Sequence, residues 1–305
     1  MLLSSPLFVE HINPALHPEQ PNRVEIIEEV LKRSQFKDLR RIQAKKGSEE
    51  QLLLIHSQSY IEMIRQSIPS IGGLTQLDAD TFLSPSSWEV LMYVTGGICQ
   101  AIDMLISENG RVFCVVRPPG HHAEKNRAMG FCIFNNAALA ARWAQQKHKI
   151  KKVAIMDFDL HHGNGTQDIF WEDASVMYAS THQMPLFPGT GAKDEVGTAN
   201  TIVNAPLHPG DGGKEFREAM NNVILPRIDD FAPELLVISA GFDAHKLDHI
   251  GELELCEKDF AWATHKLIDI ANTHANRRVI SILEGGYNLH GLALSVEEHV
   301  MALLE

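Results

Sequence analysis

The sequence predicts a single α/β domain in which helices cover both faces of a central parallel β-sheet. Short apolar segments rich in β-branched residues recur along the chain, and most are followed by a turn that contains Gly or Pro. Most gaps between these segments are long enough for a helix, and strands that alternate with helices favour right-handed crossovers in a parallel sheet. No repeat, low-complexity tract or long Gly/Ser linker divides the chain. We therefore assign residues 1–305 to one domain.

The elements follow from hydrophobic periodicity. In Glu257–Thr273, Phe260, Leu267 and Ile270 recur at nearly helical spacing, which predicts a helix with one buried face. Lys214–Asp229 is a second clear helix, and the chain before the first predicted strand is expected to be mostly helical. The best helices in that N-terminal part are Glu25–Arg33 and Trp88–Ser107. The predicted strands are Val112–Val116, Val153–Met156, Ser175–Ala179, Thr201–Val203, Leu235–Ser239 and Val279–Leu283.

Composition excludes several classes of partner. The chain has 27 Lys and Arg against 39 Asp and Glu, a net charge of −12, which argues against direct nucleic-acid binding because that needs clustered basic residues. No segment approaches the ~20 consecutive apolar residues that a membrane-spanning helix needs, so no membrane association is expected. The N-terminus lacks signal-peptide features and the four cysteines show no C-x-x-C spacing. We therefore expect a reducing, cytoplasmic location.

Polar residues follow four of the predicted strands at the points where the strands end. In open α/β sheets ligands bind outside the carboxyl ends of the strands, so these side chains are expected to meet at one edge. Asp159 and His161 stand two residues apart after one strand, and an extended backbone would direct both side chains the same way. With Asp243, which follows another strand, they offer two carboxylates and one imidazole. Three protein ligands leave an open position, the pattern of a catalytic zinc site.

The same strand ends provide groups for acid–base chemistry. His121 and His122 are adjacent, and a histidine whose far nitrogen is held by Asp157 or Asn164 has a fixed tautomer. Tyr287 follows Gly-Gly and offers a hydroxyl that could stabilise an oxyanion. An isolated D-x-H pair more often caps a helix or binds turn amides, and adjacent histidines alone are as often incidental as functional. Their occurrence together predicts a hydrolytic metal site.

Long motifs carry a family resemblance. The segments in order are HPEQPNR (residues 17–23), RPPGHHA, GFCIFNNAALAA, DFDLHHGNGTQDIF, FPGTG, SAGFDAH and LEGGYN. They resemble the zinc-dependent histone deacetylase family, in its class II-like branch, over nearly the whole chain. The resemblance implies the three-layer arginase/deacetylase fold, with a parallel sheet between helices. It also implies hydrolysis of the amide of N6-acetyl-lysine in a protein or peptide, with release of acetate.

The resemblance also implies roles for the strand-end residues. His122, paired with Asn164, is expected to be the principal general base and acid, while Asp157 holds His121 as its electrostatic partner. Tyr287 is expected to polarise the substrate carbonyl. The implied ligands of one catalytic Zn²⁺ per chain, with Fe²⁺ as the alternative metal, are Asp159, His161 and Asp243. Many class I relatives carry Asp where this chain has Asn164, so the His122 pair should be less charged here.

Further residues are implied around this centre. Phe131 and Phe187 resemble the aromatic walls of the substrate channel, although both could equally be core residues. The carbonyl of Gly130 is expected to accept a hydrogen bond from the substrate, and Ile250 to lie at the rim. The implied ligands of a structural K⁺ are Asp157, Asp159, His161, Ser180 and Thr181. A second cation site would lie near Phe170, Asp173 and Val176, where Asp173 and Thr201 depart from common relatives.

Three rival functions are weighed against deacetylation of lysine. A dimanganese ureohydrolase would need another carboxylate where the chain has His245. An acetylpolyamine amidohydrolase can carry a Glu gatekeeper in the stretch that matches Asp248–Gly251, where Ile250 is apolar and His249 replaces the usual Pro. A non-catalytic acyl-lysine binding module would lack a metal ligand or Tyr287. Because no fixed negative charge is expected at the entrance, acetyl-lysine is favoured over small acetylated amines. The natural substrate and any homo-oligomeric assembly stay open.

Overall fold

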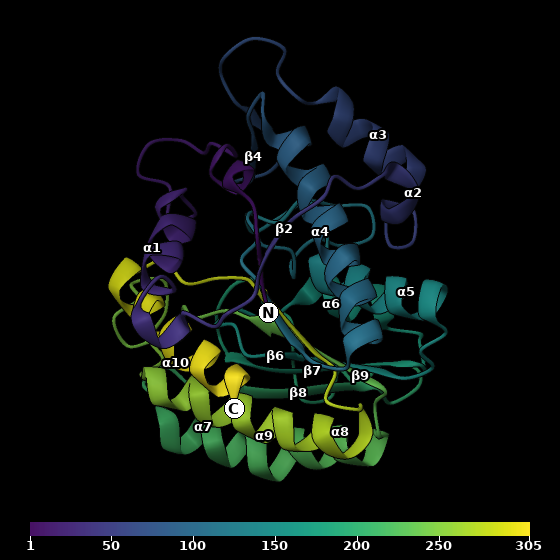
Figure 1. Cartoon of the computed structure of the whole chain (residues 1–305), viewed down its shortest axis with the longest axis vertical. Coiled ribbons are helices and arrows are strands. Elements are labelled where there is room, and N and C mark those ends of the chain that lie inside the picture. The colour runs from purple at the N-terminus through teal and green to yellow at the C-terminus, as the bar shows by residue number, and fades with distance from the viewer.

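The computed structural model describes residues 1–305 and contains one eight-stranded sheet between two layers of helices (Figure 1). Every strand pair in this sheet is parallel, and the strand order is β2-β1-β5-β10-β9-β6-β7-β8. The strands are β1 (Leu2–Ser4), β2 (Arg41–Gln43), β5 (Arg111–Cys114), β6 (Val153–Asp157), β7 (Val176–Gln183), β8 (Ile202–Leu207), β9 (Leu235–Ala240) and β10 (Val279–Leu283). The predicted parallel α/β fold is confirmed.

The structure corrects the strand predictions mainly at the sheet edges. β1 and β2 were not predicted, because each has only three residues and β2 is a largely exposed edge strand of sequence Arg-Ile-Gln. The predicted strand Val112–Val116 ends two residues too late, and β7 and β8 each run four residues beyond their predicted ends. A further antiparallel hairpin, β3 (Thr75–Gln76) with β4 (Phe82–Leu83), stands apart from the sheet.

The helices confirm the predicted periodicity and add elements that the sequence left unassigned. The α-helices are α1 (Asn22–Val30), α2 (Glu49–Leu52), α3 (Gln58–Gln66), α4 (Ser87–Glu108), α5 (Asn136–His148), α6 (Asn164–Phe170), α7 (Gly213–Ala219), α8 (Leu225–Phe231), α9 (Glu257–His274) and α10 (Leu289–Leu304). Short 3₁₀ turns lie at η1 (Pro6–Val9) and η2 (Ser34–Phe36). The region before β5 is not mostly helical as predicted, because it also contains β1 to β4 and long connecting loops.

The predicted helix Lys214–Asp229 is divided by a π-helical turn, η3 (Met220–Ile224). Pro226 follows this turn and has no N–H to donate to the preceding turn of an α-helix, so the widened turn accommodates it. In α9 the predicted apolar face is confirmed, since Phe260 and Leu267 are fully buried. The side chain of Asp259 accepts the Cys256 N–H at 3.0 Å and so fixes the start of α9.

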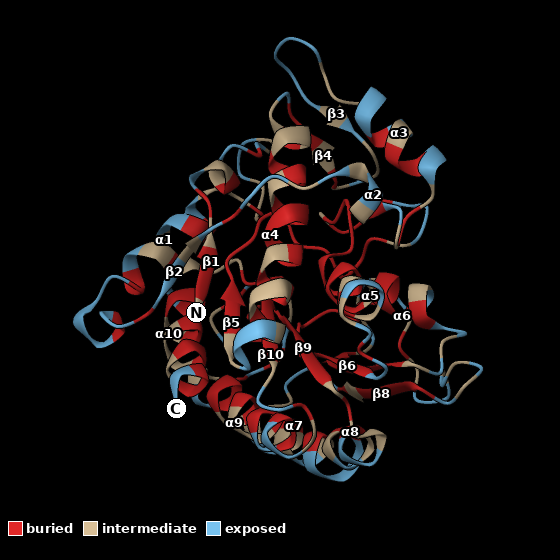
Figure 2. Ribbon diagram, turned by 45° about the vertical axis from the view of Figure 1, so that its right-hand side comes forward, coloured by how far each residue is buried: buried red, intermediate tan, exposed pale blue.

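Two helical layers enclose the core. α4 and α5 pack together on one face of the sheet, whereas α9 and α10 pack together on the other, with α1 beside α10. The strands and the inward faces of these helices form one hydrophobic cluster of 74 buried residues (Figure 2). α4 is long and apolar enough to cross a membrane by length and composition, but 67% of its most apolar window is buried inside this fold. Its composition is therefore that of a core helix.

The sheet order decides where the functional loops lie. β5, β10, β9 and β6 are consecutive neighbours in the sheet, although they are far apart in the sequence. Because all four are parallel, the segments that follow them leave at one edge of the sheet. These are the segments that the sequence singled out for their polar residues.

Candidate active site

A potential metal site lies where the segments after β6 and β9 meet. The Nδ1 atom of His161 is 3.2 Å from Oδ1 of Asp159 and 3.0 Å from Oδ2 of Asp243. One ligand atom from each residue lies within 4.8 Å of the others, and all three side chains are buried. The structure thus brings together the two carboxylates and the imidazole that the sequence selected.

Local hydrogen bonds give the loop after β6 its shape. The segment bends rather than continuing as an extended strand, contrary to the expectation from sequence, because the Asp159 N–H donates to Asp157 Oδ1 at 3.1 Å and the His161 N–H donates to Asp159 Oδ1 at 2.9 Å. The Asp159 and His161 side chains still converge. A side chain at Gly241 or Gly285 would overlap the carboxylate of Asp159, so only glycine permits this approach.

The charges at this point suit a cation. Burial alone would lower the pKa of His161, but Asp159 and Asp243 face its ring and raise the pKa to about 9. Two carboxylate oxygens and one imidazole nitrogen also form a donor set found in catalytic zinc sites, where a further position is left for water or substrate. The three residues therefore fit a divalent metal ion by donor type and by convergence.

The two adjacent histidines after β5 have different partners. The ring of His121 bonds through Nδ1 to Asp157 Oδ2 at 3.0 Å, and Nδ1 of His122 bonds to Asn164 Oδ1 at 2.8 Å. Asn164 Nδ2 donates to a carboxylate oxygen of Glu124 at 2.9 Å, which fixes the orientation of the Asn164 amide. Nδ1 of His122 must therefore carry the proton, which leaves Nε2 as a hydrogen-bond acceptor.

The protonation states of the two rings diverge. Burial would lower the pKa of His121, but Asp159 and Asp157 outweigh it and raise the pKa to about 10. Burial, reinforced by His121 and His161, holds the pKa of His122 well below its usual value. The ring centroids are only 4.0 Å apart. The pair therefore consists of a cation and a neutral base, an arrangement found in acid–base sites.

A cavity of about 250 Å³ opens above these groups. Its lining residues are Asp80, His122, Gly130, Phe131, His161, Leu186, Phe187, Ile250 and Tyr287. Phe187 is 42% exposed and Phe131 is only partly buried, so the alternative that both are core residues is wrong. The Tyr287 ring lies edge-on to Phe131 at 5.6 Å and beneath the guanidinium of Arg23 at 4.9 Å.

Asp80 is a residue that the sequence analysis missed. It lies in the turn of the β3–β4 hairpin and lines the cavity, so the expectation that no carboxylate stands near the entrance is wrong. Burial, reinforced by Asp78, raises the pKa of Asp80. No local signal could have identified it, because it follows no core strand and belongs to no periodic pattern. Only the position of the hairpin brings it into the lining of the cavity.

The residues expected to bind a monovalent cation include two residues of the metal site, Asp159 and His161, and three buried neighbours on β6 and β7. Ser180 is the register partner of Asp157 between β7 and β6, and Thr181 follows it; both side chains are buried. Near the second expected cation site, the side chain of Asp173 forms an ion pair with Arg142 at 2.5 Å. This guanidinium places a positive charge close to that site.

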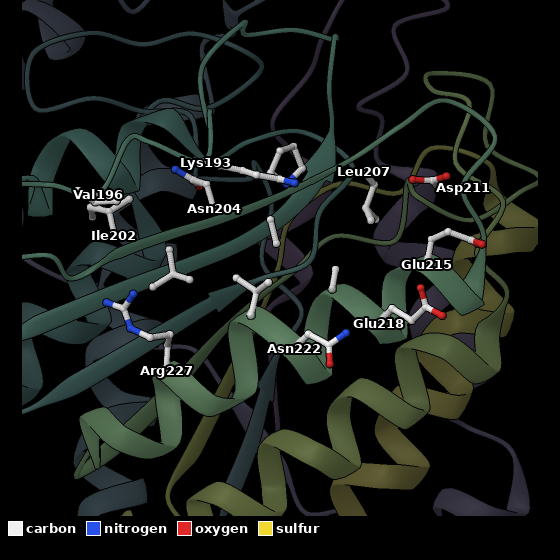
Figure 3. A pocket seen from close by; sticks show the side chains of 15 residues that line it. Lys193, Val196, Ile202, Asn204, Leu207, Asp211, Glu215, Glu218, Asn222 and Arg227 are labelled. Carbon is white, nitrogen blue, oxygen red and sulfur yellow. The ribbon is translucent and has the colours of Figure 1, made fainter.

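A larger cleft lies elsewhere on the molecule. It has a volume of about 430 Å³ and runs along edge strand β8 and the helices α7 and α8 (Figure 3). Lys193 and Arg227 contribute positive charge to its lining, and Asp211 and Glu215 contribute negative charge. None of the site residues expected from the sequence lines it. Size alone therefore does not identify the functional cavity; the convergence of metal donors, neutral histidine and tyrosine does.

Comparisons with known proteins agree with this geometry. Residues 17–303 match the family model described as "Histone deacetylase domain". The chain is 34% identical to a "Probable deacetylase" of Archaeoglobus fulgidus, covering 93% of this chain and 80% of that protein. It is 35% identical to "Histone deacetylase 10, chloroplastic" of Oryza sativa subsp. japonica, covering 96% and 70%. The solved structure described as "Crystal Structure of HDA15 HD domain" superposes with a TM-score of 0.92 at 33% identity, covering 100% of this chain and 88% of that one.

Proposed function

The chain belongs to the histone deacetylase family, and from this premise we propose that it hydrolyses the amide of N6-acetyl-lysine in a protein or peptide and releases acetate. One observation carries the proposal: a cavity lined mainly by apolar residues also contains a metal-donor histidine, a second histidine of lowered pKa and a tyrosine. These are the parts that metal-assisted amide hydrolysis requires.

We propose that Asp159, His161 and Asp243 hold one Zn²⁺, with Fe²⁺ as the alternative. When bound, the ion supplies Lewis-acid polarisation of the amide carbonyl and lowers the pKa of water. The other steps fall to the protein. His122 is positioned by Asn164 to accept a proton from the attacking water at Nε2 and to return it to the leaving amine.

Tyr287 is suited to stabilise the oxyanion that forms on the substrate carbonyl. Its hydroxyl makes no hydrogen bond to the protein, while its backbone N–H donates to Asp248 Oδ2 at 2.6 Å and so fixes the residue. A hydroxyl held in this way can donate to the developing charge without giving up another bond. Asp159 and Asp157 raise the pKa of His121, which favours its protonated form, and in that form the ring offsets the negative charge of both carboxylates.

The cavity wall favours a lysine side chain. Phe131, Leu186, Phe187 and Ile250 provide apolar surface for its four methylene groups. Gly130 lies in the same lining, and we propose that its backbone carbonyl accepts the substrate N–H. A carboxylate at the position of Asp80 can accept hydrogen bonds from backbone N–H groups of a peptide on either side of the acetylated lysine.

Asp80 also favours a second candidate function, the deacetylation of small acetylated polyamines. A polyamine carries a further ammonium group, which an ionised carboxylate at the cavity entrance would attract. The two functions differ in what they need from Asp80, because an amide oxygen can still accept hydrogen bonds from a peptide but provides no charge for an ammonium ion.

The test compares kcat/KM for acetyl-lysine peptides with that for N-acetylputrescine and N-acetylspermidine, in the parent chain and in Asp80→Asn, at low and high ionic strength. We expect the peptide to be the better substrate in both salts and Asp80→Asn to retain most peptide activity. If acetylpolyamines are better substrates at high salt and Asp80→Asn removes that advantage, the polyamine function replaces the lysine function. High salt is needed because a net charge of −12 attracts any cation at long range.

Two further proposals accompany this function. A structural K⁺ bound near Asp157, Asp159, His161, Ser180 and Thr181 would be supported by the adjacency of β6 and β7. A cytoplasmic location would be supported by the four cysteines, all of which are free thiols.

A further inference from the structure

We propose that Glu284 is a positioning residue that orders the loop carrying His121 and His122, by holding two successive backbone amides of that loop. The inference deepens the proposed function and rests on it for the role of His122. Glu284 follows β10 directly, is fully buried and does not line the substrate cavity. It therefore cannot contact substrate, and any effect on the reaction must pass through other groups.

The carboxylate of Glu284 joins three strand ends. Oε2 accepts the backbone N–H of Gly120 at 2.6 Å and that of His121 at 3.1 Å, both in the segment after β5. Oε1 accepts the hydroxyl of Ser239, on β9, at 3.1 Å. One side chain from the end of β10 thus joins both neighbouring strands of the sheet, next to the proposed acid–base pair.

The backbone of Glu284 is itself held on the other side. Arg23, fully buried, donates from Nη2 to the carbonyl of Glu284 and from Nε to the carbonyl of Gly286 at 2.7 Å. The N–H of Gly285 donates to Asp159 Oδ2 at 2.8 Å. The support for the Glu284 carboxylate is therefore rigid, and the carboxylate can transmit that rigidity to the histidine loop.

The position of the His122 ring depends on this loop. Its Nδ1 reaches Asn164 across 2.8 Å, and its ring lies 4.0 Å, centroid to centroid, from that of His121 at a tilt of 42°. Gly120 is buried, so its N–H needs a hydrogen-bond partner and would have none without Glu284. The backbone of residues 134 and 136 packs closely against Gly120, since a Cβ at this position would overlap it. Loss of the Glu284 acceptors would thus free the histidine loop within an otherwise fixed site.

Substitutions separate hydrogen bonding from charge. Glu284→Gln keeps one oxygen for the two amides, removes the charge and places an NH2 group opposite the Ser239 hydroxyl, to which it can donate, whereas Glu284→Ala removes every acceptor. Burial raises the pKa of Glu284 to about 7, so a neutral amide is a close substitute for this group near neutral pH. Ser281→Ala is the matched control, since Ser281 lies on the same strand and loses a buried hydrogen bond to His299, which is on α10.

The first measurement is hydrogen exchange of the backbone amides of residues 120–123, followed by mass spectrometry in the full chain. We expect exchange about tenfold faster or more in Glu284→Ala, with parent rates in Glu284→Gln and Ser281→Ala. The second is steady-state kinetics on an acetyl-lysine peptide with metal content measured. We expect kcat to fall about 10- to 100-fold in Glu284→Ala at an unchanged KM and metal content, with rescue to within about threefold in Glu284→Gln.

Unchanged exchange in a folded Glu284→Ala chain would overturn the proposal, as would loss of kcat in Glu284→Gln equal to that in Glu284→Ala. If Glu284→Ala does not fold, Glu284→Asp replaces it, because the shorter side chain draws the carboxylate away from the amides of Gly120 and His121; parent exchange rates in that variant would also overturn the proposal. Absence of deacetylase activity in the parent chain would refute the proposed function, while the exchange experiment would still decide whether Glu284 orders the loop.

Discussion

Replacing Tyr287 with Phe should separate catalysis from stability. The substitution removes one hydroxyl, and this hydroxyl makes no hydrogen bond to the protein. The ring that remains keeps its contacts with Arg23 at 4.9 Å and Phe131 at 5.6 Å, and its backbone N–H keeps its bond to Asp248. We therefore expect the free energy of unfolding to stay within about 0.5 kcal/mol of the parent value.

The catalytic cost should be much larger. Loss of one preorganised oxyanion donor typically lowers kcat by ~10²–10³, or about 2.7–4 kcal/mol of transition-state stabilisation. The assay is kcat on an acetyl-lysine peptide, with metal content and thermal unfolding measured on the same preparations. A loss of less than about threefold with metal retained would refute the role of Tyr287 as oxyanion donor.

Tyr60→Phe is the matched control. The Tyr60 hydroxyl is buried and donates to the carbonyl of Ile133 at 2.7 Å, and the residue lies outside the lining of the substrate cavity. Removal of that hydroxyl leaves a buried acceptor without its partner, which should cost about 1–3 kcal/mol of stability. We expect kcat per folded molecule to stay near the parent value. Tyr287→Phe should thus lower kcat and leave stability unchanged, whereas Tyr60→Phe should lower stability and leave kcat unchanged.

Three further predictions concern the metal, the cavity rim and one buried histidine, His299. Asp243→Ala should reduce the divalent metal from about one ion per chain to near zero and abolish activity while circular dichroism stays native, and full activity in the metal-free variant would falsify the ligand assignment. Ile250→Glu adds a carboxylate at the rim and should shift the kcat/KM ratio from acetyl-lysine peptide toward acetylspermidine; an unchanged ratio at low salt would show that the rim does not select substrates. Burial lowers the pKa of His299 to about 3 from an ordinary 6.5, so below pH 6.5 the unfolded chain binds a proton that the folded chain rejects, and stability should fall as pH falls from 6.5 towards 3. The free energy of unfolding is measured in urea at pH 7 and pH 5 for the parent and for His299→Gln. Between these pH values the parent should lose more of this free energy than the variant, by about 1.4 kcal/mol for each pH unit below 6.5. Equal losses in the two chains would contradict this role of His299.

Strong local patterns in the sequence correctly predicted much of the fold. The helical spacing of Phe260, Leu267 and Ile270 predicts α9, and a short apolar run predicts β10. In both cases the signal lies in residues that are close together in the sequence. Where an element is short or exposed, as in β1 and β2, or adapts to a single proline, as at Pro226, the local pattern does not determine the outcome. Such elements depend on partners that are distant in the sequence.

The sequence by itself determined which groups could serve the candidate site. Asp159, His161, Asp243 and the histidine pair stand in long motifs after strands, and the structure brings them together at one edge of the sheet. Their chemistry is a property of residue type and needs no knowledge of the fold.

Only the tertiary structure decided which other residues lie next to these groups. The strand order β5-β10-β9-β6 places Glu284 against the backbone of His121, and the position of the β3–β4 hairpin brings Asp80 into the cavity lining. A single acidic residue has no periodicity, and its role depends on contacts between segments more than 40 residues apart. Long-range packing of short segments fixes those contacts, because a strand of a few residues carries too little local information to select its own neighbours.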